Sequence, residues 1–255
     1  MAWQDRFALT GRKALITGAS KGIGAEICAV FAEAGADIVA LGRDAADLQA
    51  TADAVRAMGR RCLTLTAEMA SPTEPVQACE RALAEWGTID ILVNCAGIAN
   101  VAPALEFATE DWDRMMAVNL RAPFLTARTL APAMIAQRWG KIINISSQTG
   151  VIALDDHAAY ASSKGGLNAL TKSLCAEWAR HNVQVNAICP TVVMTPMGRK
   201  VWGPPEKGDP FRKATPARRF AEAVEVADAA LYLASDASAM VNGALLMVEG
   251  GFTSV

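Results

Sequence analysis

Seven short apolar runs, separated by longer segments with helical periodicity, constrain the fold of this chain more than any other feature. Runs this apolar are typical of strands buried on both faces, which occur in parallel sheets covered by helices. The alternation predicts an α/β fold: a single doubly wound, Rossmann-type parallel sheet with helices on both faces and right-handed crossovers. We expect one domain over residues 1–255. The runs occupy residues 13–18, 37–42, 62–67, 89–97, 140–147, 183–190 and 244–251.

Two of the helical segments have recognisable ends. Apolar residues recur at helical spacing from residue 23 and stop at Gly35, and the next helix is expected to begin after Asp44, a favourable N-cap. Residues 195–211 are instead rich in Pro, Gly and Lys and read as a loop. Long segments of this kind in compact domains are usually binding elements. We therefore expect a substrate lid over about residues 191–215.

Composition and charge exclude several classes of protein. The net charge is −2, from 24 basic and 26 acidic residues, so neither a nucleic-acid nor a membrane partner is expected. We expect neither a transmembrane span nor a signal peptide, because the chain has no apolar run of transmembrane length and its first residues lack an unbroken apolar stretch. Its six cysteines form no C-x-x-C pair, which favours reduced thiols in a cytoplasmic protein. With two histidines and no acidic cluster at ligand spacing, we expect no metal site.

The sequence TGASKGIG, residues 17–24, lies between the first expected strand and the first expected helix. Gly18 permits a tight turn, Gly22 lets the backbone approach a pyrophosphate, and Gly24 allows the helix and strand to pack closely. The N-terminus of the following helix offers free N–H groups to phosphates. This strand–turn–helix context predicts a dinucleotide cofactor.

The choice of cofactor should be visible at the end of the second expected strand, about 20 residues further on. An NAD site places a carboxylate there, whereas this chain has Arg43, and the next residue, Asp44, is accounted for as a helix cap. Arg43 can bind a 2′-phosphate with two hydrogen bonds, and Lys21 can approach the same group. Each cation alone is equally consistent with a solvated surface position, but together they favour NADP.

The sequence HAAYASSKGG, residues 157–166, places Tyr160 four residues before Lys164. On a helix these side chains share a face. A phenol has an ordinary pKa of about 10, and we expect the nearby ammonium, with the positive nicotinamide of an oxidised cofactor, to lower it toward neutral pH. The pair therefore indicates proton transfer, with a solvated helix start as the plainer interpretation.

Three motifs in this order, TGASKGIG, NCAG and Tyr160-x-x-x-Lys164, resemble those of the short-chain dehydrogenase/reductase family over essentially the full length. The segments NISSQ, HAAYASSKG and PTVVMTPMG further resemble the dicarbonyl/L-xylulose reductase group of that family. The chain departs from the commoner pattern at Cys95, where a second Asn is usual, and at Glu68, where an Asp often faces the adenine. Thr191 replaces a usual Gly, although the xylulose-reductase group also has Thr there.

The resemblance implies four catalytic residues. Tyr160 would be the general acid for carbonyl reduction and the base for the reverse reaction, while Ser147 would hold the substrate oxygen. Its neighbour Ser146 would point to the opposite side of an extended chain. Asn119 would link Lys164 to solvent through water, although it also fits a satisfied polar position within a helix.

The resemblance also implies the residues that bind cofactor and substrate. Gln148 and His157 can hydrogen-bond a second substrate oxygen, while Leu154 and Trp202 can close an apolar wall. His157 could instead cap the following helix, and Trp202 could only anchor the lid. The expected substrate residues are Ser147, Gln148, Leu154, His157, Tyr160 and Trp202. The expected cofactor residues are Gly18, Ser20, Lys21, Gly22, Ile23, Gly24, Arg43, Glu68, Asn94, Ala96, Gly97, Tyr160, Lys164, Pro190, Val193 and Thr195.

These expectations together indicate NADPH-dependent reduction of a small carbonyl compound, an α-dicarbonyl or a ketose. The reaction would be reversible as a polyol or secondary-alcohol dehydrogenase, and the resemblance implies a homotetramer. Two alternatives stay open. One is a reductase of 3-oxoacyl thioesters, and the other is a non-catalytic sensor that binds NADP(H).

Overall fold

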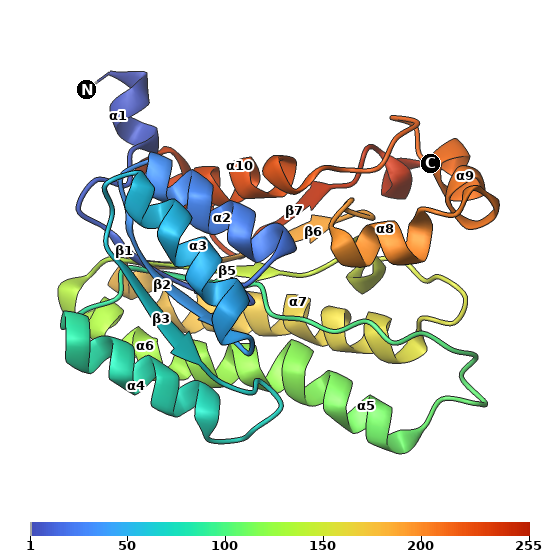
Figure 1. Cartoon of the computed structure of the whole chain (residues 1–255), viewed down its shortest axis with the longest axis horizontal. Helices are drawn as coiled ribbons and strands as arrows, with labels where there is room; N and C mark the ends of the chain where they lie inside the picture. Colours follow the sequence, from blue (N-terminus) through green and yellow to red (C-terminus); the bar gives the residue numbers. More distant parts are fainter. Residues whose placement is uncertain (1) are drawn as a thin grey trace.

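The computed structural model describes residues 2–255 and contains one seven-stranded sheet (Figure 1). The strands lie in the order β3-β2-β1-β4-β5-β6-β7, and every neighbouring pair is parallel, as the alternating sequence pattern predicts. The strands are β1 (Lys13–Thr17), β2 (Asp37–Gly42), β3 (Cys62–Thr66), β4 (Ile91–Asn94), β5 (Gly140–Ile145), β6 (Val183–Pro190) and β7 (Leu245–Val248).

Helices cover both faces of the sheet, and strand β2 shows why its sequence is apolar throughout. Ile38 and Ala40 belong to the core on one face, whereas Val39 and Leu41 belong to the core on the other. Figure 1 shows α2, α3 and α10 above the sheet and α4, α6 and α7 below it. The α-helices are α1 (Trp3–Phe7), α2 (Gly22–Glu33), α3 (Ala45–Ala57), α4 (Glu74–Trp86), α5 (Thr109–Met116), α6 (Ala122–Gln137), α7 (Ala158–Trp178), α8 (Pro196–Trp202), α9 (Pro205–Ala214) and α10 (Ala223–Ala234).

The two predicted helix ends are confirmed. Helix α2 ends just before Gly35, whose φ of 103° favours glycine. The Asp44 carboxylate caps α3 by accepting hydrogen bonds from the backbone N–H groups of Ala46 and Asp47. These ends matter for function because they set where the loops at the carboxyl edge of the sheet begin.

The prediction of a loop over residues 195–211 is wrong, because this segment forms helices α8 and α9. Proline is favoured in the first turn of a helix, and each of the two helices begins with one. The hydroxyl of Thr195 also caps α8 by accepting a hydrogen bond from the N–H of Gly198, at 3.1 Å. The sequence has the right residues for two short helices, and the abundance of Pro and Gly hides them.

Strand β1 has β2 on one side and β4 on the other, so the chain reverses the direction in which it builds the sheet at this point. In open parallel sheets, ligands bind in the crevice outside the carboxyl ends of the strands at such a reversal. Within residues 2–255, no helix is long and apolar enough to cross a membrane. The same part of the chain contains no cluster of His, Cys, Asp and Glu that could hold a metal ion.

Candidate active site

The turn between β1 and α2 forms a cradle that side chains would fill. Gly18 has a φ of 69°, and a Cβ there would lie 2.9 Å from the backbone of Ala96. A Cβ on Gly24 would lie 2.2 Å from the carbonyl oxygen of Gly18, so the helix and the turn are in direct backbone contact. Helix α2 has no side-chain cap and no acid in its first turn. Its free N–H groups and positive dipole end therefore fit the pyrophosphate of a dinucleotide.

The remaining predicted cofactor residues of this turn lie around the cradle. Lys21 is the exposed N-cap residue of α2, while Ser20 and Ile23 are half-buried. Gly22 has a φ of 60°, and a Cβ there would lie 3.1 Å from the Thr195 side chain. The structure thus brings together two predicted cofactor residues that are far apart in sequence.

The hydroxyl of Thr17 joins the glycine turn to the NCAG segment after β4. It accepts hydrogen bonds from the backbone N–H groups of Cys95 and Ala96, both at 3.0 Å. The Asn94 side chain, in contrast, is buried and hydrogen-bonded to the side chains of Asn144 and Thr126, at 2.9 and 2.7 Å. The Asn94 side chain therefore anchors the NCAG segment to neighbouring elements. It is not available for direct contact with a cofactor.

The cations predicted to bind a 2′-phosphate are exposed, and each lies near a carboxylate. Arg43 is 3.5 Å from Glu68, and Lys21 is 3.8 Å from Asp47. Glu68, predicted to face the adenine, also lies 3.8 Å from Arg114. Hydrogen bonding from Ala70, followed by the charges of Arg43 and Arg114, holds the pKa of Glu68 below its ordinary value. Such exposed ion pairs are weak, so a phosphate can compete for Arg43 and Lys21.

Ser147, Tyr160 and Lys164 converge at the carboxyl end of β5. Ser147 follows the strand, while Tyr160 and Lys164 lie one turn apart on α7. Ser147 hydrogen-bonds the Tyr160 phenol in the sense that favours the phenolate, and the Lys164 amine is 5.7 Å from the centre of the Tyr160 ring. Ser146 is turned away and donates to the Lys164 backbone carbonyl instead, at 3.3 Å.

The expectation that Lys164 lowers the pKa of Tyr160 is wrong for the protein by itself. Burial raises the pKa of Tyr160 above its ordinary value, and the hydrogen bond from Ser147 offsets only part of that rise. Burial also lowers the pKa of Lys164 to about 8, because the ammonium loses its hydration. The sequence pattern placed the two groups together but did not reveal how completely they are buried.

Asn119 lies in a π-helical turn, Ala117–Arg121, between α5 and α6. Turns of this kind often occur at functional sites. Its side chain is fully buried and exchanges two hydrogen bonds with the backbone of Ile98, both at 2.9 Å. It also donates to the Ser163 hydroxyl at 3.1 Å. An added Cβ on Gly97 would lie 3.5 Å from Asn119 and 3.6 Å from Lys164, so both predicted residues border the same small space.

The predicted substrate residues near Ser147 and Tyr160 differ in burial and in their contacts. Gln148 directly follows Ser147, is 2% exposed, and its side-chain oxygen is buried without a hydrogen-bond partner. The His157 ring lies 6.3 Å from the Tyr160 ring and makes no capping bond to α7. Leu154 is half-buried, three residues before His157. Of the two polar residues, His157 therefore lies beside the phenol, while Gln148 is next to Ser147 in the chain.

Trp202 belongs to an aromatic cluster that holds the segment 191–215 to the C-terminal residues. Its ring lies 4.9 Å from that of Phe211, which stacks at 4.7 Å on Phe252. Whether Trp202 also closes a substrate wall stays a prediction. Of the predicted cofactor residues here, Pro190 ends β6 and Val193 forms a bridge to Ala221.

Sequence reasoning missed three residues that shape the site. Thr17 joins two loops, Arg114 pairs with Glu68, and Thr149 donates a 2.8 Å hydrogen bond to the Ser147 hydroxyl. Thr191, noted only as a departure from the family pattern, has a buried hydroxyl oxygen without a partner. A Ser followed two residues later by Thr is a local signal for such a turn.

Comparison with known families and curated proteins gives full-length matches. The family model described as enoyl-(acyl carrier protein) reductase matches residues 18–253. The D-threitol dehydrogenase of Mycolicibacterium smegmatis is 42% identical, over 97% of this chain and 95% of that protein. The L-xylulose reductase of Bos taurus is 40% identical, over 96% and 97%. The NAD-dependent glycerol dehydrogenase of Listeria innocua is 39% identical, over 97% and 96%.

Solved structures agree with these matches. A gluconate 5-dehydrogenase from Burkholderia cenocepacia, in complex with NADP and tartrate, superposes with a TM-score of 0.95 at 40% identity. The match covers all of both chains. Similarity of this extent establishes both the fold and the family of this chain.

Proposed function

The chain belongs to the short-chain dehydrogenase/reductase family, and on that premise we propose that it interconverts a small polyol and the corresponding carbonyl compound with NADP(H). The names of the similar proteins support sugar and polyol substrates. A nicotinamide cofactor, when bound, supplies or accepts the hydride. The protein then has to bind the substrate oxygen, exclude water and move one proton.

Tyr160 is placed to move that proton. In reduction its phenol donates to the substrate oxygen, while the Ser147 hydroxyl donates a second hydrogen bond to the same atom. Because burial keeps the pKa of Tyr160 raised, the phenol is protonated at neutral pH. Rising pH should therefore slow reduction and speed alcohol oxidation, which needs the phenolate.

The observation that carries the substrate proposal is the partnerless side-chain oxygen of Gln148. A buried acceptor without a donor is costly, and a substrate hydroxyl beside the reacting carbon would satisfy it. This feature favours a ketose or polyol, and His157 beside Tyr160 offers a further polar contact. A monoketone would leave the oxygen of Gln148 unpaired.

A substrate panel with Gln148→Leu tests the proposal. The wild-type enzyme should have a higher kcat/KM for L-xylulose, and for diacetyl, than for butanone. Gln148→Leu should lower kcat/KM for the ketose about 10- to 150-fold, the equivalent of about 1.4–3 kcal/mol, and leave butanone nearly unchanged. Equal rates for all three ketones would contradict the proposal. Turnover only of a 3-oxoacyl thioester would transfer it to thioester reduction, and no turnover at all would favour a sensor.

The preference for NADP rests on Arg43 and Lys21 at the adenosine end of the cradle. One similar enzyme is named as NAD-dependent and another is seen with NADP, so the family alone does not decide. Arg43→Ala should weaken NADPH binding about 10- to 150-fold, as expected for a charge-assisted bond of about 1.5–3 kcal/mol. NADH binding should hardly change. Equal affinity of the wild-type protein for NADH and NADPH would contradict this part.

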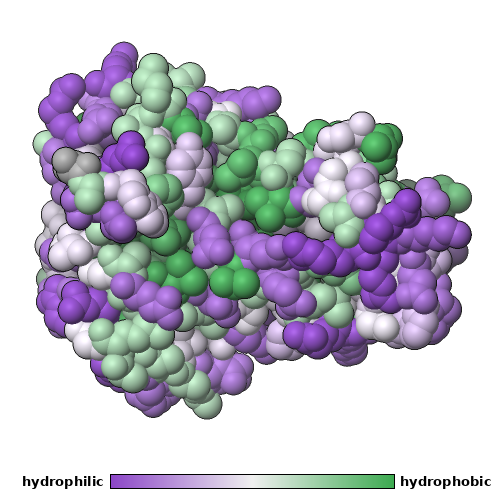
Figure 2. All heavy atoms as spheres, turned by 90° about the horizontal axis from the view of Figure 1, so that it is seen from above, coloured by the Kyte–Doolittle hydropathy of each residue, from purple (hydrophilic) through white to green (hydrophobic). Residues whose placement is uncertain are grey.

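We also propose a homotetramer. Edge strand β7 carries four half-buried apolar residues, and Trp112 and Phe124 are each 38% exposed. Figure 2 shows apolar surface (green) in the middle of the face that carries α10 and β7 at the top of Figure 1. Exposed sheet edges and apolar patches favour association. A monomeric mass by light scattering at micromolar concentration would contradict the proposal.

A further inference from the structure

The turn that follows β5 contains a residue that no part of the proposed reaction uses. Ser147 begins a 3₁₀ turn, Gln148–Gly150, and its hydroxyl oxygen accepts two hydrogen bonds from Thr149. One comes from the backbone N–H of Thr149 at 3.2 Å, and the other from its hydroxyl at 2.8 Å. Thr149 is 5% exposed. The turn is held to α7 by a hydrogen bond from the Asn168 side chain to the Gly150 carbonyl, at 3.1 Å.

This arrangement decides the direction of the Ser147 hydrogen bonds. A serine hydroxyl has one O–H to donate and two lone pairs that accept. Thr149 occupies both acceptor positions, so the O–H of Ser147 can only donate outward. In the protein alone this O–H lowers the pKa of the Tyr160 phenol by hydrogen bonding, and a bound substrate oxygen would take its place. Because Ser147 has no lone pair left to accept with, the O–H of Tyr160 is left to point at a substrate.

We propose that Thr149 is a positioning residue: it keeps Ser147 a hydrogen-bond donor, toward Tyr160 in the protein alone and toward the substrate oxygen when substrate is bound. The inference rests on the proposed function for its catalytic consequence, whereas the direction of the Ser147–Tyr160 bond can be tested without substrate. Without the Thr149 hydroxyl, Ser147 regains a free lone pair and can accept the Tyr160 proton. The phenol would then be turned away from the substrate and stabilised in its neutral form.

The other groups around Tyr160 do not change in such a variant. Lys164 lies on the same helix, and His157 lies at its start. Cys95, after β4, and Cys189, in β6, both act on Lys164, and burial raises the pKa of each thiol. None of these contacts passes through Thr149. A change in the titration of Tyr160 therefore reports the direction of the Ser147 bond.

The test compares Thr149→Val, which keeps the shape and removes the hydroxyl, with Thr149→Ser, which keeps the hydroxyl. The chain has only two tyrosines, so the ultraviolet absorbance of tyrosinate, with Tyr160→Phe as reference, gives the pKa of Tyr160. We expect Thr149→Val to raise that pKa by about one unit, since one unit corresponds to one moderate hydrogen bond. Thr149→Ser should restore it.

The kinetic readout is separate. Thr149→Val should lower kcat for ketone reduction about tenfold or more, and Thr149→Ser should recover most of it. The KM for the cofactor should stay nearly constant. Thr129→Val is a matched control, because it also removes a 2.8 Å hydroxyl bond, to the Leu125 carbonyl on α6. It should alter neither the titration nor kcat.

An unchanged Tyr160 titration in Thr149→Val would overturn the inference, and so would a loss that Thr149→Ser fails to restore. If the valine variant does not fold, Thr149→Ala carries the same expectations. A wild-type protein that turns over no ketone or polyol would defeat the proposed function alone. In that case the titration would still decide whether Thr149 sets the direction of the Ser147 bond.

Discussion

Two lysines at opposite ends of strand β5 are equally buried but differently surrounded. Lys141, near the start of the strand, is 3% exposed, and Lys164, which bonds to the last residue of the strand, is 4% exposed. Burial lowers the pKa of each from an ordinary value near 10.5 to about 8. Neither burial nor pKa therefore distinguishes them.

Their hydrogen bonds do. The Lys141 amine bonds to the side chain of Gln184, to the Ser235 carbonyl at 2.9 Å and to the Ser238 hydroxyl at 3.1 Å, which accounts for all three of its donors. The structure gives the Lys164 amine one such bond, to the Ile145 carbonyl at 2.8 Å. Unused donors, rather than burial, identify the lysine that can act on another molecule.

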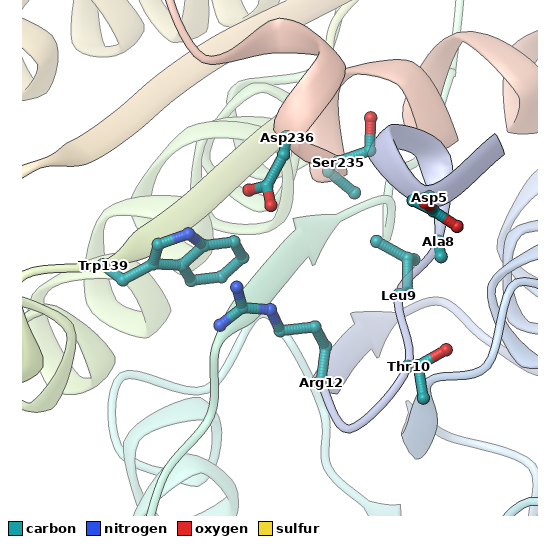
Figure 3. A pocket seen from close by; sticks show the side chains of 9 residues that line it. Asp5, Ala8, Leu9, Thr10, Arg12, Trp139, Ser235 and Asp236 are labelled. Carbon is teal, nitrogen blue, oxygen red and sulfur yellow. The ribbon is translucent and has the colours of Figure 1, made fainter. Parts of the chain in front are cut away.

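The surface near Lys141 supports this distinction. The pocket in Figure 3 lies at that end of the sheet, and its walls include Arg12, Trp139, Ser235 and Asp236. Arg12 lies over the Trp139 ring, 3.6 Å from its centre. Ser235 turns its carbonyl to Lys141, and the nearby charges of Asp236 and Arg12 act on the pKa of Lys141 in opposite directions. Lys141 thus belongs to a hydrogen-bond network that connects β5 to the C-terminal end of α10.

The strongest test of the comparison is Lys164→Met. We expect kcat/KM to fall about 100- to 10,000-fold, the usual contribution of acid–base groups, because the amine would no longer assist Tyr160. Stability should change little, since one hydrogen bond is lost and a buried charge is removed. Steady-state kinetics and thermal unfolding measure the two effects. A loss of activity below tenfold would mean that unused donors do not identify a functional lysine.

The complementary variant, Lys141→Met, should have the opposite profile. Gln184, Ser235 and Ser238 would lose the group that satisfies them, so we expect a loss of about 2–3 kcal/mol in the free energy of unfolding. For a chain of this size that is a fall of roughly 4–12 °C in Tm. The kcat/KM should remain close to wild type. Chemical denaturation gives the free energy, and a large kinetic defect in a folded variant would contradict the comparison.

The smallest effect is in the pH dependence of stability. Between about pH 8 and the ordinary pKa of lysine, the unfolded state keeps a proton that the folded state releases, so Lys141 makes stability rise with pH. The slope is at most about 1.4 kcal/mol per pH unit. Lys141→Met should remove this contribution. Because the buried thiols titrate alike in both proteins, the difference between the two curves isolates the lysine, and parallel curves would contradict the lowered pKa.

Much of the architecture was predictable because its signals are local. Apolar strands such as residues 37–42 had to be buried on both faces, Asp44 had to cap the next helix, and glycines had to line the turn after β1. The pairing of Tyr160 with Lys164 follows from helical spacing alone. Each of these depends on a few adjacent residues, which the sequence shows directly.

The remaining features depend on contacts that the sequence pattern does not show. Burial of Tyr160, which reverses the expected direction of its pKa shift, arises only in the folded chain. The hydrogen bonds of Asn94 are satisfied by residues 32 and 50 positions away. The π-helical turn at Asn119 departs from regular helical spacing, and Thr149 acts through the hydroxyl of a neighbour.

The contact between Gly22 and Thr195 has a consequence for how the protein is made. Gly22, on one side of the cradle, is synthesised early. Thr195, on the other side, is added 173 residues later. At roughly 5–20 residues per second, that interval lasts about 9–35 s. During this time the nascent chain can fold its first strands and helices, but it cannot close around a nucleotide. We therefore expect tight nucleotide binding only from a chain whose synthesis has passed Thr195.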